Sequence, residues 1–188
     1  MNLDATPDMK TGIYKVNINI GEIIIGKKSW ICCPKHHDME KAFYKTYFEV
    51  EKRHWWFRVR RNIIFWLIQK YDISKTAKIF DFGCGSGYLA GELQKMGYNA
   101  SGSDTSREAI EFGRQRGIKN IEAVQSDEMP QEGGFDVILA LDVIEHIKDD
   151  TGAIKGLEKA LKPGGALIIT VPAYQWMWGV QDEVAHHF

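Results

Sequence analysis

Short apolar runs alternate with helix-like segments from residue 76 onward, and no other feature of the sequence limits the fold as much. The runs lie at residues 78–82, 98–103, 121–125, 135–141 and 166–171. Consecutive strands that are separated by helices pair in parallel, because a parallel pair needs a long crossover connection. The alternation therefore predicts an α/β fold with a mostly parallel sheet.

Two regions precede this alternation. Residues 46–72 are rich in aromatic side chains and carry apolar residues at helical spacing, whereas residues 13–31 alternate like one or two short strands. The patterns predict a helix that packs on the sheet and, before it, a short β hairpin. We therefore expect an N-terminal extension at residues 1–45 and one main domain at residues 46–188. Within that domain we expect a helical cap at 46–72 and a sheet core at 76–172.

The charge of the chain is unevenly spread. Residues 1–75 hold 14 Lys and Arg against 8 Asp and Glu, whereas residues 76–188 hold 10 against 17. An acidic domain repels polyanions and suits a cationic ligand, so we expect no nucleic-acid partner. The basic, aromatic stretch at 52–61 leaves RNA or an anionic membrane surface open as a partner, although it contains no recognition motif.

Neither a membrane span nor a disulfide framework is expected. The sequence has no run of eighteen apolar residues and no signal-peptide pattern at its start, which predicts a cytoplasmic protein. Its three cysteines are too few for a disulfide scaffold. The stretch CCPKHH at 32–37 offers thiols and imidazoles, but adjacent ligands of this kind seldom converge on one tetrahedral metal ion, so we expect no metal.

The loop FGCGSG at 82–87 places three glycines, Gly83, Gly85 and Gly87, after an apolar run. A dinucleotide fingerprint has the spacing G-x-G-x-x-G, and Tyr88 stands where its third glycine would fall. A phosphate-binding P-loop needs Gly-Lys followed by Ser or Thr, which the loop lacks. These mismatches indicate a ligand that is not held through a phosphate.

Acidic residues follow three of the expected strands. Asp81 lies just before the glycine loop, where it attracts an ammonium group or a hydroxyl hydrogen. Asp104 ends the second strand, a position from which a carboxylate can accept both hydroxyls of a ribose. Asp127 follows the third strand and could accept from an adenine amine. Together they predict a nucleoside derivative bound at the carboxyl ends of the strands.

These segments together resemble a class I S-adenosylmethionine-dependent methyltransferase. The resemblance covers about residues 46–188 and rests on DFGCGSG, the acid at 104, SDE at 126–128, FDVILALDVIEH at 135–146 and LKPGGALIITVP at 161–172. It implies a Rossmann-like doubly wound sheet with the strand order 3-2-1-4-5. The stretches at 54–61 and 182–187 are also similar to a subgroup that acts on small molecules.

The resemblance implies a cofactor site for S-adenosylmethionine and its product S-adenosylhomocysteine. Asp81 and the first glycines would approach the methionine part, Asp104 the ribose, and Asp127 with the Glu128 amide the adenine. The carbonyl of Leu141 would accept from the amino group. The implied cofactor-binding set is Asp81, Gly83, Cys84, Gly85, Asp104, Thr105, Ser126, Asp127, Glu128 and Leu141.

The resemblance also implies where methyl transfer takes place. Asp142, Glu145 and His146 follow the fourth strand, over the expected methyl group. A histidine or carboxylate there can take a proton from a hydroxyl acceptor, and an imidazole has a suitable pKa. We therefore expect an enzyme that methylates a small molecule on oxygen, nitrogen or carbon by in-line displacement. The aromatic stretch HWWF at 54–57 is the expected cover of the cofactor.

Two other functions stay open from the sequence: a regulator that binds S-adenosylmethionine without catalysis, and an NAD-type nucleotide-binding domain. The class I fold normally continues past its fifth strand into an antiparallel strand pair, whereas this sequence stops at Phe188. On that basis we expect the 188-residue chain to bind the cofactor but to transfer its methyl slowly or not at all. We also expect an open edge at strand 166–171, covered by the segment at 13–31 or used for a homodimer.

Overall fold

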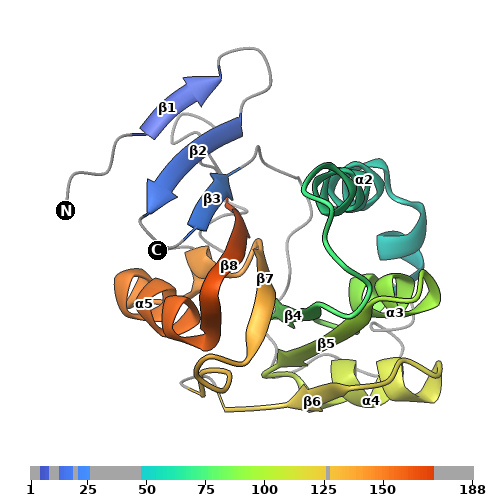
Figure 1. The fold of residues 1–188 in the computed structure, drawn as a ribbon. Helices are drawn as coiled ribbons and strands as arrows, with labels where there is room; N and C mark the ends of the chain where they lie inside the picture. Colours follow the sequence, from blue (N-terminus) through green and yellow to red (C-terminus); the bar gives the residue numbers. More distant parts are fainter. Residues whose placement is uncertain (1–4, 9–12, 19–20, 26–47, 126–127, 172–188) are drawn as a thin grey trace, which may run out of the picture. The chain divides into compact units, whose positions relative to one another are not determined.

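The computed structural model describes residues 5–8, 13–18, 21–25, 48–125 and 128–171, the three N-terminal segments as backbone only. The chain divides into two compact units, one of residues 36–126 and one of residues 1–35 and 127–188. Each unit has its own strands, helices and buried side chains (Figure 1).

Three parallel strands form the sheet of the unit at 36–126. They are β4 (Lys78–Phe82), β5 (Asn99–Asp104) and β6 (Ile121–Ala123), and β5 pairs with both of the others. Two helices connect them, α3 (Tyr88–Lys95) and α4 (Arg107–Gln115). Before β4 the chain is helical at 48–53 and in α2 (Trp55–Lys70). The predicted order 3-2-1 of the first three strands is therefore confirmed.

The burial of β4 explains why this sequence forms an interior strand. Four of its five residues are buried, as expected of a parallel strand that is covered on both faces. The core beside it includes Ile110 and Ile121, which pack with Cys84. In the sequence, Thr105 and Glu108 have the spacing of a capping box at the start of α4, which predicts Thr105 as the cap. The structure differs, because Ser106, and not Thr105, caps the helix: its hydroxyl accepts from the Ala109 amide at 3.1 Å. Thr105 is exposed.

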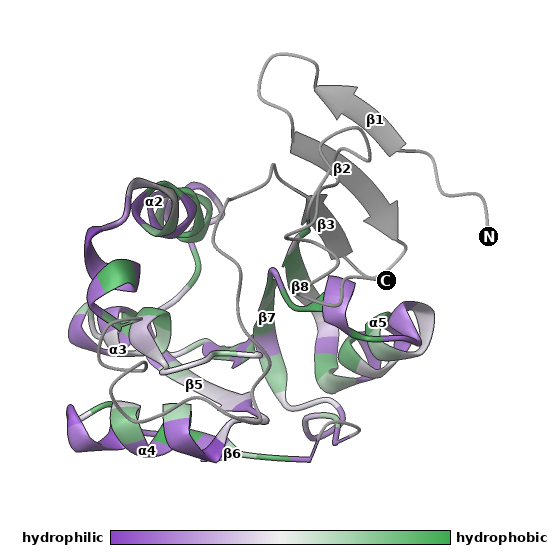
Figure 2. Ribbon diagram, turned by 180° about the vertical axis from the view of Figure 1, so that it is seen from behind, coloured by the Kyte–Doolittle hydropathy of each residue, from purple (hydrophilic) through white to green (hydrophobic). Residues whose placement is uncertain are grey.

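Two further parallel strands belong to the other unit, β7 (Phe135–Leu141) and β8 (Leu161–Thr170). Between them lie the short 3-10 helix η1 (Ile144–His146) and α5 (Asp150–Ala160). The last five residues of β7 are buried, and Figure 2 shows β7 and β8 largely in the hydrophobic colour. This pairing confirms the predicted neighbours 4 and 5. The strand begins earlier than the predicted residue 166, with an irregularity in the pairing opposite Phe135 and Val137.

An antiparallel meander forms the N-terminal part of this unit, from β1 (Ala5–Asp8), β2 (Ile13–Ile18) and β3 (Gly21–Ile25). β2 and β3 pair antiparallel in the segment where a short hairpin was expected, and β1 adds a strand that we did not predict. The third strand pairs in parallel with β8, through Ile23 with Leu167 and Ile24 with Ile168. The segment at 13–31 therefore covers this part of the β8 edge, which is one of the two arrangements expected from the sequence, and the homodimer stays a prediction.

Candidate functional site

The glycine loop after β4 is held against β5 by backbone hydrogen bonds. The amides of Gly83 and Cys84 both donate to the Ser103 carbonyl at 2.9 Å. Gly83, Gly85 and Gly87 have φ angles of 71°, 55° and 71°, which are strained for any residue with a Cβ. The loop therefore takes its shape from its glycines.

Asp104, at the end of β5, is tied directly to this loop. One carboxylate oxygen accepts from the Gly85 amide at 2.7 Å, and the other accepts from the Ser106 amide at 2.8 Å. The side chain is buried. Because each carboxylate oxygen can accept two hydrogen bonds, Asp104 keeps one acceptor position on each oxygen beside the loop.

Asp81 is the second buried acid of this unit. Burial raises the pKa of its carboxyl from 3.8 to about 7. The Arg60 guanidinium opposes this rise in pKa, while the carboxylates of Glu51 and Asp104 add to it. Arg60 is half-buried, and its guanidinium lies 5.1 Å from the Phe57 ring centre.

Glu51 is a third acid of the same cluster, and the sequence analysis missed it. It lies in the helical segment 48–53, is buried, and accepts a hydrogen bond of 2.8 Å from the Ser86 hydroxyl in the glycine loop. Burial raises the pKa of its carboxyl from 4.5 to about 7, against the lowering effect of the Ser86 hydrogen bond. Only the fold brings Glu51 to the loop, since 35 residues separate the two side chains.

Two glycines outside the loop also shape it, and the sequence analysis missed both. A Cβ on Gly102 would lie 2.8 Å from the Asp81 carbonyl oxygen, and a Cβ on Gly113 would lie 2.1 Å from the Ser86 carbonyl oxygen. Real Cβ atoms do not approach backbone so closely. The sequence did offer a signal for both, because a glycine inside a strand (Gly102) or inside a helix (Gly113) suggests that another part of the backbone approaches closely.

The residues predicted for catalysis belong to the other unit. Asp142 follows β7 with a φ of 55°, and its carboxylate accepts from the Thr170 hydroxyl at 2.8 Å. Glu145 and His146 lie in η1, where Glu145 is half-buried and His146 is exposed. Leu141 is buried at the end of β7. The roles that we assigned to these four residues stay predictions.

The remaining predicted site residues fall into two groups. Ser126 and Asp127 lie outside the described residues, as does the cluster at 32–37, while Glu128 is exposed. Cys84 is buried in the loop, and burial raises the pKa of its thiol well above the ordinary value. A protonated thiol is a poor nucleophile, so Cys84 serves the site by packing.

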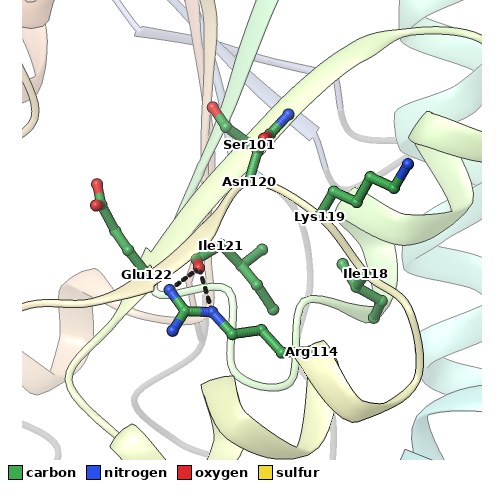
Figure 3. A pocket seen from close by; sticks show the side chains of 7 residues that line it. All are labelled: Ser101, Arg114, Ile118, Lys119, Asn120, Ile121 and Glu122. Carbon is green, nitrogen blue, oxygen red and sulfur yellow. Dashed lines mark hydrogen bonds between the residues drawn. The ribbon is translucent and has the colours of Figure 1, made fainter.

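A pocket of about 460 Å³ lies elsewhere in the unit at 36–126, near the start of β6 (Figure 3). Arg114, Lys119, Asn120 and Glu122 are among the residues that line it. The Arg114 guanidinium donates to the Ile121 carbonyl at 3.0 and 2.7 Å, so this cation is already engaged by the backbone. None of the predicted site residues lines the pocket, and we assign the site to the glycine loop.

The chain is similar in sequence to known methyltransferases. Over 101 residues it is 28% identical to a ubiquinone biosynthesis O-methyltransferase of Xanthomonas oryzae pv. oryzae, a match that covers 50% of this chain and 42% of the relative. Over 135 residues it is 29% identical to a protein of the same name from Acinetobacter baumannii, covering 63% and 57%. The chain thus spans about half the length of these curated relatives.

The fold has a counterpart among solved structures. A SAM dependent methyltransferase from Aquifex aeolicus aligns with a TM-score of 0.52 and 19% identity, over 79% of this chain and 88% of that one. At this identity the likeness shows a shared fold, and it confirms the doubly wound class predicted from the sequence. A family model described as a methyltransferase domain matches residues 52–187, which is more than half of the chain.

Proposed function

The chain belongs to the family of methyltransferase domains, and on that premise we propose that it transfers a methyl group from S-adenosylmethionine to a small-molecule acceptor. The observation that carries this proposal is the glycine loop with its three buried acids, Glu51, Asp81 and Asp104. A buried group of three carboxyls is costly unless a cation or hydroxyl donors meet it. S-adenosylmethionine offers both, since it has a sulfonium, an ammonium group and a ribose.

The loop also has the space that such a cofactor needs. A Cβ built on Gly85 meets no atom within 4 Å, in contrast to Gly102 and Gly113 behind the loop. The glycine backbone therefore faces open space on one side and is packed on the other. Asp104 keeps acceptor positions for two hydroxyls, and the acidic surroundings disfavour a phosphate. These residues fit the cofactor.

When bound, the cofactor supplies an activated methyl group on a sulfonium. The protein then has to hold the two reactants in line and keep water out. In our proposal Asp104 holds the ribose hydroxyls and Asp81 the ammonium group, while the Ser86 hydroxyl and Glu51 fix the loop between them. Because the two carboxyls with a pKa of about 7 are partly protonated near neutrality, binding of a cation would release protons from them.

The acceptor side of the proposal rests on His146. Its exposed imidazole, next to Glu145, has the chemistry to take a proton from a hydroxyl acceptor. The names of the curated relatives favour oxygen as the methylated atom. We further propose that residues 46–188 carry this activity with residues 1–45 as an extension, and that the protein acts in the cytoplasm without a nucleic-acid partner. The adenine contacts of Asp127 and Glu128 belong to the same proposal.

Calorimetry and mass spectrometry test the proposal in two steps. S-adenosylmethionine and S-adenosylhomocysteine should bind, with proton release seen as a heat that depends on the ionisation enthalpy of the buffer, whereas NAD should not bind. A screen of phenolic acceptors should then yield a product heavier by one methylene. Binding of NAD alone would replace the proposal by a redox domain, and cofactor binding without product from any acceptor would favour the regulator.

The variant His146→Asn separates the two halves of the proposal. We expect turnover to fall about a hundredfold or more, the usual worth of a general base, with cofactor affinity unchanged. Glu128→Gln is the matched control, since it lies on the proposed adenine side and should not alter the pH dependence of turnover. An unchanged turnover in His146→Asn would remove the histidine from the mechanism.

A further inference from the structure

The helix α2 exposes a stripe of large apolar side chains. Trp55, Val59, Ile63 and Trp66 follow one another at intervals of four, four and three residues, which places them on one face of the helix. Trp55 is 59% exposed and Trp66 is 51% exposed. At a rise of about 1.5 Å per residue, the two indole rings are anchored roughly 16 Å apart along the axis.

The stripe is not the face that holds α2 to its own unit. Phe57, Ile64 and Ile68 are buried and lie on the opposite side of the helix, and the buried Leu67 lies between that side and the stripe. The helix therefore carries large apolar side chains both on its buried side and on its exposed side, and Figure 2 shows hydrophobic and hydrophilic residues mixed along it. Single exposed apolar residues are ordinary, but a contiguous row that includes two tryptophans marks an interaction surface.

The surroundings of the stripe are strongly basic. Residues 52–70 contain no Asp or Glu, and they carry six cations, Lys52, Arg53, Arg58, Arg60, Arg61 and Lys70. Lys52, Arg53, Arg58 and Lys70 are exposed. The ammonium of Lys70 lies 4.5 Å from the Trp66 ring centre, so cation and ring present one combined surface. An apolar row flanked by cations is complementary to a surface that has an apolar interior and anionic groups at its outside.

We propose that α2 docks the protein on an anionic lipid bilayer, lying flat in the headgroup region with Trp55, Val59, Ile63 and Trp66 turned toward the acyl chains. Tryptophan prefers this interfacial depth, and basic side chains beside it meet the lipid phosphates. RNA would also use cations and aromatic rings, but Val59 and Ile63 add nothing to base stacking or phosphate binding. The aliphatic centre of the stripe therefore favours lipid.

This docking is peripheral. Among the described residues no helix combines the length and the apolar character that crossing a bilayer requires. Docking on the surface also does not depend on the proposed methyl transfer, because α2 would bind lipid with no cofactor or acceptor present. The two proposals can therefore fail separately.

Vesicle binding by the full chain tests the inference. Vesicles of phosphatidylglycerol and phosphatidylcholine at about 3:7 should sediment the protein and shift its tryptophan emission to shorter wavelength, with quenching by brominated acyl chains. Pure phosphatidylcholine should bind at least about tenfold more weakly, and 0.5 M salt should weaken binding to the anionic vesicles.

Variants assign the binding to α2. The double change Trp55→Ser and Trp66→Ser should lower the vesicle partition coefficient at least about tenfold, and Arg58→Glu with Lys70→Glu should do the same on anionic vesicles only. Met96→Gln, on another exposed apolar residue of the same unit, is the control and should bind as wild type. Circular dichroism and thermal unfolding confirm that each variant is folded.

The inference is overturned if the wild-type chain does not bind anionic vesicles, or if the double tryptophan variant, shown to be folded, binds them as well as wild type. Binding of a single-stranded RNA with equal loss in both variants, and no vesicle binding, would assign the same surface to RNA instead.

Discussion

Asp104 and Asp142 are both acids at the end of a parallel strand, yet they are held in opposite ways. Asp104, after β5, is buried and accepts two backbone amides, so its charge shapes the loop beside it. Asp142, after β7, accepts one hydroxyl from Thr170, and its backbone has a φ of 55°, which is unusual for a residue with a Cβ. At Asp104 the side-chain carboxylate holds the local structure through its hydrogen bonds, whereas at Asp142 the distinctive feature is the backbone conformation.

This difference teaches which parts of the site are built in advance. The loop end of the unit at 36–126 has three buried acids and two loop amides that share the Ser103 carbonyl. The end of β7 presents a strained backbone and an exposed His146. Strain at such a position is typical of functional sites, and it persists only where the surroundings enforce it. The glycine loop is thus fixed by buried hydrogen bonds, whereas the end of β7 carries its strain in the backbone of Asp142.

The largest effect is expected behind the glycine loop. Gly113→Ala should lower the free energy of unfolding by about 3 kcal/mol, because its Cβ would meet the Ser86 carbonyl oxygen and displace the loop from α4. Chemical denaturation measures this change. The neighbouring exposed Gln115→Ala is the control and should stay within about 0.5 kcal/mol of wild type. A stable Gly113→Ala protein would mean that the loop can shift freely.

Isosteric changes test the comparison of the two acids directly. Asp104→Asn should lower the free energy of unfolding by about 2 kcal/mol, because one of the two buried amides would then face an N–H₂ group. Asp142→Asn should cost less than about 0.5 kcal/mol, since Asn tolerates this backbone conformation and its amide oxygen can still accept from Thr170. Thermal and urea unfolding measure both variants. If Asp104→Asn and Asp142→Asn lose the same free energy of unfolding, the two acids do not differ in their structural role.

The dependence of stability on pH sharpens the account of the loop end. In the folded chain the pKa of Glu51 is raised from 4.5 to about 7, so the unfolded chain gives up this proton at lower pH. The contribution of protonated Glu51 to the free energy of unfolding is fully present below pH 4.5 and is lost as the pH rises through 7. Between these limits wild type should lose up to about 3 kcal/mol of unfolding free energy relative to Glu51→Gln, which keeps an acceptor for Ser86, since each unit of pKa shift is worth about 1.4 kcal/mol.

The contrast is measured by urea unfolding of both proteins at several pH values. The difference between the two free energies of unfolding should be flat above about pH 8. A difference that grows with pH in favour of wild type would show that Glu51 is already ionised in the folded chain and that burial does not control it.

The smallest effect separates two adjacent residues. Ser106→Ala should cost about 1 kcal/mol, the usual worth of a helix cap, because the Ala109 amide loses its acceptor. Thr105→Ala should change the free energy of unfolding by less than about 0.5 kcal/mol, since Thr105 is exposed. A larger loss in Thr105→Ala would restore the cap that the sequence predicted.

Local patterns predicted the strands well where burial alone defines them. The limits of β4 and β7 agree with the predicted runs 78–82 and 135–141, because a strand covered on both faces is a mostly apolar run. The cap of α4 was displaced by one residue, since Thr105 and Ser106 are both competent caps and only the backbone entering the helix chooses between them.

The candidate site was predictable where it follows strands and not where it depends on contacts distant in sequence. Asp81 and Asp104 were predictable from their positions at the carboxyl ends of β4 and β5. Glu51 does not, because nothing near it in the sequence indicates a buried carboxyl hydrogen-bonded to Ser86. The pairing of β3 with β8 was one of two options from the sequence, since strand pairing between distant segments is not encoded in either strand alone.

The contact behind the loop also has a genetic consequence. Glycine is the one residue without a Cβ, so every missense mutation of the Gly113 codon adds the atom that would collide with the Ser86 carbonyl. Selection at this position should therefore be as strict as at a reacting residue, although Gly113 takes no part in the proposed chemistry. In a saturation library scored for folded protein rather than for turnover, position 113 should be depleted of all nineteen alternatives, which distinguishes a residue that shapes the site from one that reacts in it.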